Sequence, residues 1–213
     1  MVPTSVGDRK RVAKPAAERR QEIIQASLKL FMDKGFGETT VQDLAQQAGV
    51  ATGTVYLYFP SKDHVLLALH QELHLGMATL VTEIAAEMFE RIGKGDKVDY
   101  REAIDAVVDA MAIYCEEKKA YAYVCMRYLP GSGLADEVRK EEVKFAEMLK
   151  AIYEQATAAG IMHISDPEMA AVLINAAIST TFGNWAAFSE PADLERLTAA
   201  TKEFLYKVLA PPD

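Results

Sequence analysis

Apolar residues recur at intervals of three or four positions through most of this 213-residue chain. This is the spacing of helices that bury one face, and no segment shows the sustained alternation typical of a half-buried strand. Breaks rich in glycine, proline and serine separate the periodic segments. The pattern predicts an all-α protein of about nine helices, with helical segments near residues 17–34, 40–48, 52–58, 62–76, 77–92, 99–119, 120–129, 134–159, 166–188 and 191–209.

The two short helices near 40–48 and 52–58 are joined by a tight turn. Thr40 can cap the first of them, because its side-chain oxygen can accept a free backbone N–H of the first turn. Gly49 follows where a helix end favours a left-handed residue. Val50, Val55 and Phe59 can anchor the second helix, and its other residues then divide between exposed and partly buried positions. This arrangement is typical of a helix-turn-helix that presents side chains to the major groove of DNA.

The segment from about Ala17 to His70 resembles the DNA-binding domain of the tetracycline-repressor (TetR) family of bacterial transcription regulators. The matching positions, at fixed spacing, are Ala26, Leu30, Phe31, Gly35, Thr39, Thr40, Leu44, Ala45, Ala48, Gly49, Val50, Gly53, Thr54, Tyr56, Tyr58, Phe59, Lys62 and Leu66. The resemblance implies a three-helix helix-turn-helix domain over residues 17–75. It also implies a larger helical effector-binding and dimerisation domain over 76–213. The polar, basic residues at the N-terminus predict a flexible basic arm over 1–16, which is either a solvated tail or an arm that reaches DNA phosphates or the neighbouring minor groove.

The resemblance also assigns roles within the motif. Hydroxyl groups, a helix N-terminus and an ammonium group suit DNA phosphates, and the positions that match phosphate contacts in the family are Thr40, Tyr56, Tyr58 and Lys62. Positions that approach base edges are Thr52, Gly53, Thr54 and Leu57, where an apolar group favours a thymine methyl. The alternative for Tyr56 and Tyr58 is packing against the first helix of the pair.

One position departs from the family pattern. Ala51 stands where the family usually has a serine that caps the second helix, so Thr52 becomes an alternative cap if that helix starts one residue later. Ala51 also supports a rival interpretation, in which the protein is a helical ligand-binding or scaffolding protein whose DNA domain has decayed.

Charge is distributed unevenly along the chain, whose net charge is −8. Residues 1–62 carry a balance of +3 and residues 63–213 a balance of −11. A mildly basic end on an acidic body suits a protein that holds DNA at that end. Cys115 and Cys125 form no metal or disulfide pattern, and the uncharged run 169–189 is punctuated by polar residues. We therefore expect a cytoplasmic protein with no membrane helix.

Aromatic and soft side chains cluster in residues 114–128, which is typical of ordinary core but also of an apolar pocket. Since the family commonly carries an effector pocket in this part of the chain, the residues predicted to bind an unidentified small-molecule effector are Tyr114, Tyr121, Tyr123 and Arg127. Arg127 could pair with a carboxylate or phosphate through its fork geometry. His70 and His74, four residues apart, could share a metal, but without an evident third ligand a solvated or core-edge pair is favoured.

The last two segments carry small residues and an apolar surface that serves either an internal core or a homodimer interface. The resemblance implies that these two helices pair with those of a second subunit, and a palindromic DNA operator requires such a two-fold dimer. No nucleophile elbow or phosphate-binding glycine loop is present in the sequence. We expect a regulator, a repressor released by its effector, rather than an enzyme, with no resident cofactor or metal.

Overall fold

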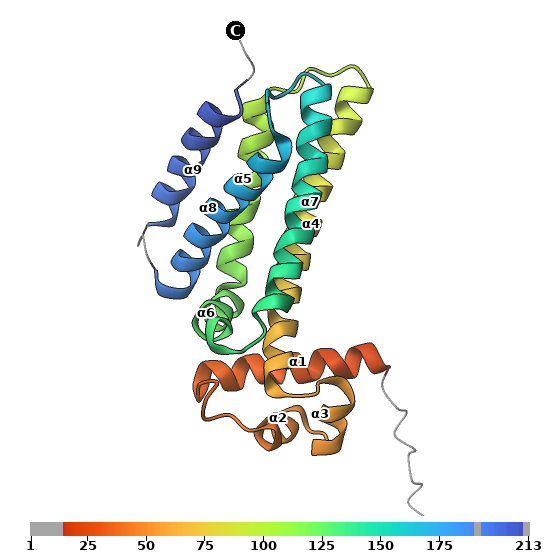
Figure 1. Ribbon diagram of the computed structural model, residues 1–213, viewed down its shortest axis with the longest axis vertical. Coiled ribbons are helices and arrows are strands. Elements are labelled where there is room, and N and C mark those ends of the chain that lie inside the picture. Colours follow the sequence, from red (N-terminus) through yellow and green to blue (C-terminus); the bar gives the residue numbers. More distant parts are fainter. Residues whose placement is uncertain (1–14, 190–192, 211–213) are drawn as a thin grey trace, which may run out of the picture.

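The computed structural model describes residues 15–189 and 193–210 (Figure 1). Within these ranges it contains nine α-helices, one short 3₁₀ turn and no strand, which confirms the all-α prediction. The elements are α1 (Ala16–Asp33), α2 (Val41–Ala48), α3 (Thr52–Tyr58), α4 (Lys62–Gly93), α5 (Tyr100–Glu117), α6 (Lys119–Tyr128), η1 (Leu129–Gly131), α7 (Ala135–Ala158), α8 (Pro167–Phe188) and α9 (Leu194–Val208). The predicted basic arm lies almost entirely outside the described residues.

Helices α1, α2 and α3 form a small unit at one end of the molecule, below the long helices of the body (Figure 1). Its core is fully buried and joins the apolar faces of all three helices to the first turns of α4. The side chains at its centre are Ile23, Ile24, Phe31, Leu44, Val55, Val65, Leu66 and Leu69. The start of α4 is therefore part of the small unit.

Helix α4 differs from the sequence prediction, which ended one helix near Gly76 and began another at residue 77. The helix runs without interruption from Lys62 to Gly93. Gly76 is retained inside it because a Cβ at this position would lie only 2.8 Å from Cζ of Tyr114. The glycine reflects close packing of α5 on α4, and the helix extends from the small unit through the body.

The body consists of the remainder of α4 with α5 to α9. Its main core gathers side chains from four elements, including Val108 on α5, Phe182 and Trp185 on α8 and Leu205 on α9. Helix α6 lies at the end of the body next to α1, and Tyr121, Val124 and Cys125 extend the core of the small unit into it. None of the described helices is long and apolar enough to cross a membrane.

Candidate nucleic-acid interface and ligand cavity

The turn between α2 and α3 is fixed at both ends. Thr40 and Asp43 form a capping box in which Thr40 Oγ1 accepts from the Asp43 backbone N–H at 3.1 Å and Asp43 Oδ2 accepts from the Thr40 N–H at 2.8 Å. Gly49 then ends α2 in the left-handed region at φ +66°. Ala51 is the N-cap of α3 and makes no side-chain cap hydrogen bond, so the alternative of Thr52 as the cap is wrong.

Helix α3 buries one side and exposes the other. Val55 and Phe59 are inside the core, while Leu57 is 82% and Tyr56 53% exposed. Thr52, Thr54 and Tyr58 are half-buried, Gly53 is exposed, and nothing lies within 4 Å of the place where a Cβ would stand on Gly53. Tyr58 packs partly on the core, as the alternative interpretation held for it, whereas Tyr56 points away. The exposed side of α3 is therefore free to enter a DNA groove.

Two of the predicted phosphate contacts are occupied by bonds within the protein. Lys62 Nζ donates to the carbonyl oxygens of Phe36 at 2.7 Å, Gly37 at 3.1 Å and Thr39 at 3.0 Å, and lies 4.5 Å from the Phe36 ring centroid. Since an ammonium group has three donors, all of them are used. Lys62 therefore holds the loop before α2 in place, and its predicted DNA contact stays a prediction.

Thr40 is occupied in a similar way, because its hydroxyl also donates to Asp43 Oδ2 at 2.8 Å. Lys34, 2.7 Å from the same oxygen, together with the Thr40 bonds holds the pKa of Asp43 down at about 2. The N-terminus of α2 is thus already paired with a carboxylate. The Thr40 hydroxyl is committed to the cap, and its predicted phosphate contact stays a prediction.

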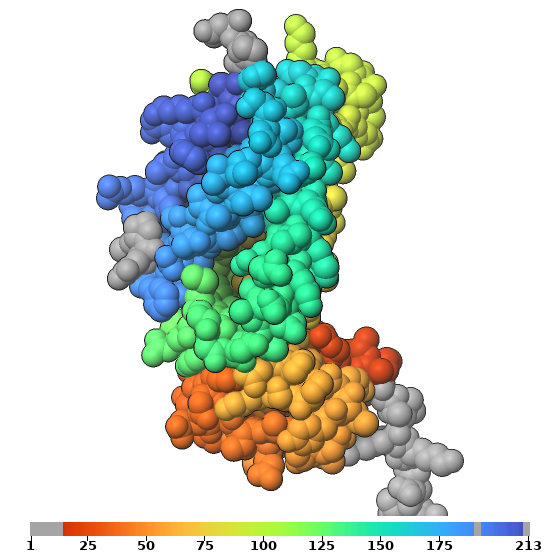
Figure 2. Space-filling view, viewed as in Figure 1, coloured from red at the N-terminus to blue at the C-terminus, as the bar shows by residue number. Residues whose placement is uncertain are grey.

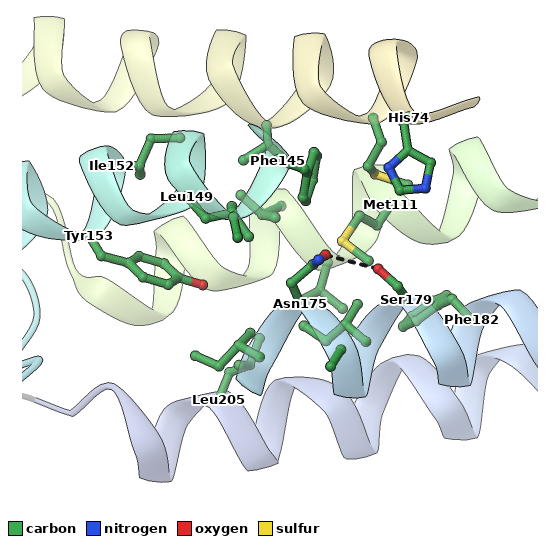
Figure 3. A pocket seen from close by; sticks show the side chains of 18 of the residues that line it. His74, Met111, Phe145, Leu149, Ile152, Tyr153, Asn175, Ser179, Phe182 and Leu205 are labelled. Carbon is green, nitrogen blue, oxygen red and sulfur yellow. Dashed lines mark hydrogen bonds between the residues drawn. The ribbon is translucent and has the colours of Figure 1, made fainter. Parts of the chain in front are cut away.

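A cavity of about 550 Å³ lies inside the body, enclosed by α4, α5, α6, α7, α8 and the last turns of α9. Its walls are mostly aliphatic, sulfur-containing and aromatic, and Figure 3 shows His74 and Met111 toward one end and Ile152 and Tyr153 toward the other. A hollow between α6, α7 and α8 is visible in Figure 2, and Met126, Arg139 and Gly183 from these three helices line the cavity. Its volume is in the range of small-molecule sites.

The four residues predicted to bind an effector do not line this cavity. Helix α6 turns Ala122, Cys125 and Met126 toward it, and this i, i+3, i+4 spacing directs the intervening side chains elsewhere. Tyr123 and Arg127 stack on each other instead, with the guanidinium carbon 5.8 Å from the ring centroid. The small and sulfur-containing residues of the 114–128 cluster face the cavity, and its aromatic and cationic residues do not. The helical spacing of Ala122, Cys125 and Met126 is the feature of the sequence from which these lining residues could have been predicted.

Tyr114 and Tyr121 make structural contacts on either side of α4. Tyr114 donates to the Leu73 carbonyl at 3.0 Å, and burial raises its pKa to about 12. Tyr121 is bonded to Gln25 of α1, and its hydroxyl donates to Glu72 of α4 at 3.2 Å. Tyr114 thus joins α5 to α4, and Tyr121 joins the body to α1 of the small unit. Their contacts with an effector stay predictions.

His70 and His74 lie side by side at the end of the cavity near α6, with ring centroids 4.1 Å apart. Burial, reinforced by the charge of His74, lowers the pKa of His70 to about 3. Burial also lowers the pKa of His74, against the opposing effect of Glu141. Both rings are therefore neutral near pH 7. In residues 15–189 and 193–210, no group of three or more His, Cys, Asp or Glu side chains could hold a metal ion.

The fold and these two sites define a class of protein: a helix-turn-helix DNA-binding unit joined by one continuous helix to a body with an internal cavity. The family model described as bacterial regulatory proteins of the tetR family matches residues 23–69. This match identifies the small unit as a DNA-binding domain of the tetR-family type.

Relatives are similar mainly in the small unit. The chain is 41% identical over 61 residues to the uncharacterised regulator YerO of Bacillus subtilis, a match that covers 29% of this chain and 21% of YerO. The chain spans 21%, 18% and 56% of the lengths of the first three curated relatives that it matches.

Solved structures share the fold over nearly the whole chain. FadR of Bacillus subtilis in complex with stearoyl-CoA aligns with a TM-score of 0.68 at 22% identity, covering 88% of this chain and 98% of FadR. Thermus thermophilus FadR in complex with lauroyl-CoA aligns with a TM-score of 0.59 at 20% identity, covering 91% of this chain and 96% of that protein.

Proposed function

We propose that this protein is a ligand-responsive transcription regulator, a repressor that binds a palindromic DNA operator as a homodimer and releases it when a small molecule enters the cavity. The observation that carries the proposal is the exposed side of α3. Leu57 is 82% exposed on a helix whose opposite side is fully buried, and a protein in water gains nothing by presenting such a side chain unless something covers it.

The proposed DNA contacts follow from the placement of each group. Gly53 and Thr54 lie near the start of α3, where the backbone can approach base edges closely, and Leu57 lies one turn further on. Tyr56 adds an exposed hydroxyl for a phosphate. Together these residues would place one helix of each subunit in one major groove. A two-fold dimer would therefore contact two half-sites.

The proposed dimer uses α8 and α9. Part of the apolar surface predicted for these helices packs internally, since Trp185, Leu197, Leu205 and Leu209 are buried. A second set of apolar side chains on the same helices is about half exposed or more: Met169, Leu173, Phe188, Phe204 and Val208. An exposed apolar surface shared by two adjacent helices is suited to a self-complementary contact.

The proposed switch runs through α4. Val65, Leu66 and Leu69 belong to the core of the small unit, and the next turns of the same helix, with His70, Leu73 and Met77, line the cavity. A ligand that fits one tilt of α4 better than another shifts the population of that tilt and moves both copies of α3 relative to successive grooves. A hundredfold difference in ligand affinity between the two states corresponds to about 2.7 kcal/mol.

The effector is proposed to be a molecule with a long apolar part. The cavity is lined mainly by apolar side chains and both of its histidines are neutral, so an uncharged chain is favoured inside it. Because two structural neighbours hold stearoyl-CoA and lauroyl-CoA, lauroyl-CoA is the first effector to test.

The test is selection of genomic DNA fragments by the purified protein at near-physiological salt, followed by sequencing of the retained fragments. Recovery of one palindromic sequence supports the proposal, and addition of lauroyl-CoA should then release it. Leu57→Ala should weaken binding to that sequence by about 1–3 kcal/mol without changing the salt dependence. The matched control is Leu75→Ala, since Leu75 is also exposed but lies on α4 in the body.

If the wild-type protein retains no fragment even at low salt, with or without lauroyl-CoA, the proposal is wrong and the rival helical ligand-binding protein is favoured. The dimer is tested separately by sedimentation. Phe204→Glu should give monomers, whereas Ile113→Glu, an exposed apolar position on α5, should not.

A further inference from the structure

The polar groups of the cavity differ in whether they already have a partner. Ser179 Oγ donates to Asn175 Oδ1 at 2.9 Å, so these two side chains satisfy each other in the wall formed by α8 (Figure 3). Tyr153 lies at the opposite end from the histidines and is surrounded by aliphatic side chains. Neither the Ser179–Asn175 pair nor Tyr153 therefore offers an unpartnered polar group at the end of the cavity near α6.

His70 is different. Its side chain is 7% exposed, and its Nε2 atom is buried with no hydrogen-bond partner among the described residues. A buried polar atom without a partner costs free energy, so most such atoms in native proteins are paired with protein, water or ligand. His70 also lines the cavity, which places this atom at the wall of the space in which a ligand would lie.

We propose that His70 Nε2 is the hydrogen-bond anchor for the polar head of a ligand whose alkyl chain extends along the cavity toward Tyr153. This inference deepens the proposed function by naming the ligand's orientation and the group that holds its head. The head is an uncharged hydroxyl or carbonyl, because a neutral imidazole nitrogen can accept from the first or donate to either.

The chemistry of the two cavity ends supports this orientation. Around Tyr153 the wall is built from Leu149, Ile152 and other apolar side chains, which suit a hydrocarbon tail. The ring of His74 lies 4.1 Å from that of His70, and the cavity lining on α7 includes the exposed Arg139 and Glu142 of opposite charge. A ligand that enters between α6, α7 and α8 therefore meets its polar surroundings first and its apolar surroundings at depth.

The anchor is placed where binding can reach the small unit. Leu69, the residue before His70, is fully buried in the core shared by α1, α2 and α3. A hydrogen bond made to His70 therefore acts within one residue of that core.

The test uses two probes that report separately on the head and on the chain. Diphenylhexatriene is an elongated hydrocarbon with no hydrogen-bonding group, and its fluorescence reports its own binding. Decan-1-ol, which displaces it, carries one hydroxyl on an alkyl chain. His70→Phe should weaken decan-1-ol binding roughly tenfold, the effect of losing one hydrogen bond, and change diphenylhexatriene binding less than about twofold.

Two further variants make the result specific. His70→Gln retains a donor and an acceptor and should recover much of the decan-1-ol affinity. His163→Phe makes the same substitution at an exposed histidine that does not line the cavity and should leave decan-1-ol binding unchanged. Thermal unfolding followed by circular dichroism establishes that each variant is folded, and if His70→Phe does not fold, the same comparison is made with His70→Leu.

The inference is overturned if His70→Phe binds decan-1-ol as the wild type does, or if both probes weaken equally, which would indicate a packing role. It is also overturned if decan-1-ol does not bind the wild type. Operator binding by the same preparations distinguishes this from failure of the proposed function: a protein that binds operator and responds to lauroyl-CoA independently of His70 retains the function without the anchor.

Discussion

Lys62 offers the sharpest test of the DNA-binding unit, because two roles for it lead to opposite results. The family resemblance predicts a phosphate contact, whereas the structure uses all three of its donors on the carbonyls of Phe36, Gly37 and Thr39. A hydrogen bond from a charged group contributes about 1.5–3 kcal/mol net. Phe36 and Gly37 are at least partly exposed and their carbonyls can turn to water, whereas Thr39 is buried, so we count one such bond rather than three. The contact with the Phe36 ring adds about 0.5–1 kcal/mol.

Lys62→Met should therefore lower the free energy of unfolding by about 2–4 kcal/mol, measured by urea denaturation of the full chain. Binding to operator at 10 °C, where the variant is still folded, should keep the wild-type salt dependence. Lys29→Met, at an exposed position on α1, is the matched control and should change stability by less than about 0.5 kcal/mol. The reasoning is refuted if Lys62→Met is as stable as the control while the slope of log affinity against log salt falls by about 1, since that result identifies a phosphate contact.

Three further predictions concern single packing, capping and protonation features. Gly76→Ala should lower the free energy of unfolding in urea by about 1–3 kcal/mol, because its Cβ would overlap Tyr114, although alanine has the better helix propensity. The same change in a Tyr114→Leu background should cost less, because the overlap is then relieved. Thr40→Val should remove the capping box with Asp43 and lower the melting temperature by a few degrees, a result contradicted by an unchanged transition. The pKa of His70 is about 3 in the folded protein against about 6.5 when unfolded, so the unfolded chain binds more protons between these values and stability falls as pH falls below about 6.5. His70→Phe should therefore lose about 1 kcal/mol less stability than the wild type between pH 7 and pH 5.5, measured by urea denaturation at both values.

The elements that the sequence predicted well are those whose ends have a local chemical cause. Thr40 forms the expected cap of α2, and Gly49 ends that helix with positive φ. Both features depend on side chains within a few residues of the helix end, so they can be read without knowledge of the tertiary fold. The exposed position of Leu57 was also predictable, because Val55 and Phe59 fix which side of α3 is buried.

Contacts between distant segments are the part of the structure that the sequence did not predict. Gly76 suggested a break in α4, but its small size is required by Tyr114, which lies 38 positions further along the chain. The hydroxyl of Tyr121 is bonded to Gln25 and Glu72, two contacts that the sequence did not indicate, and its predicted effector contact stays a prediction. An aromatic residue with a polar tip serves a cavity and a helix junction equally well, so composition alone did not distinguish them.

The same structure explains why ligand entry and DNA binding cannot be independent in this molecule if the proposed function holds. Cys125 belongs to the buried core of the small unit and also lines the cavity, so one side chain of α6 is shared by both. Leu73 of α4 likewise packs against the cores of both parts and borders the cavity. Close-packed side chains transmit displacement because they have little free volume into which to relax. A ligand that pushes against either residue must therefore change the packing beneath α1, and the Gln25 contact of Tyr121 gives α6 a second attachment to that helix. Two attachments on separate helices favour movement of the small unit as a rigid body rather than its local distortion, which is the motion needed to change the spacing of two recognition helices.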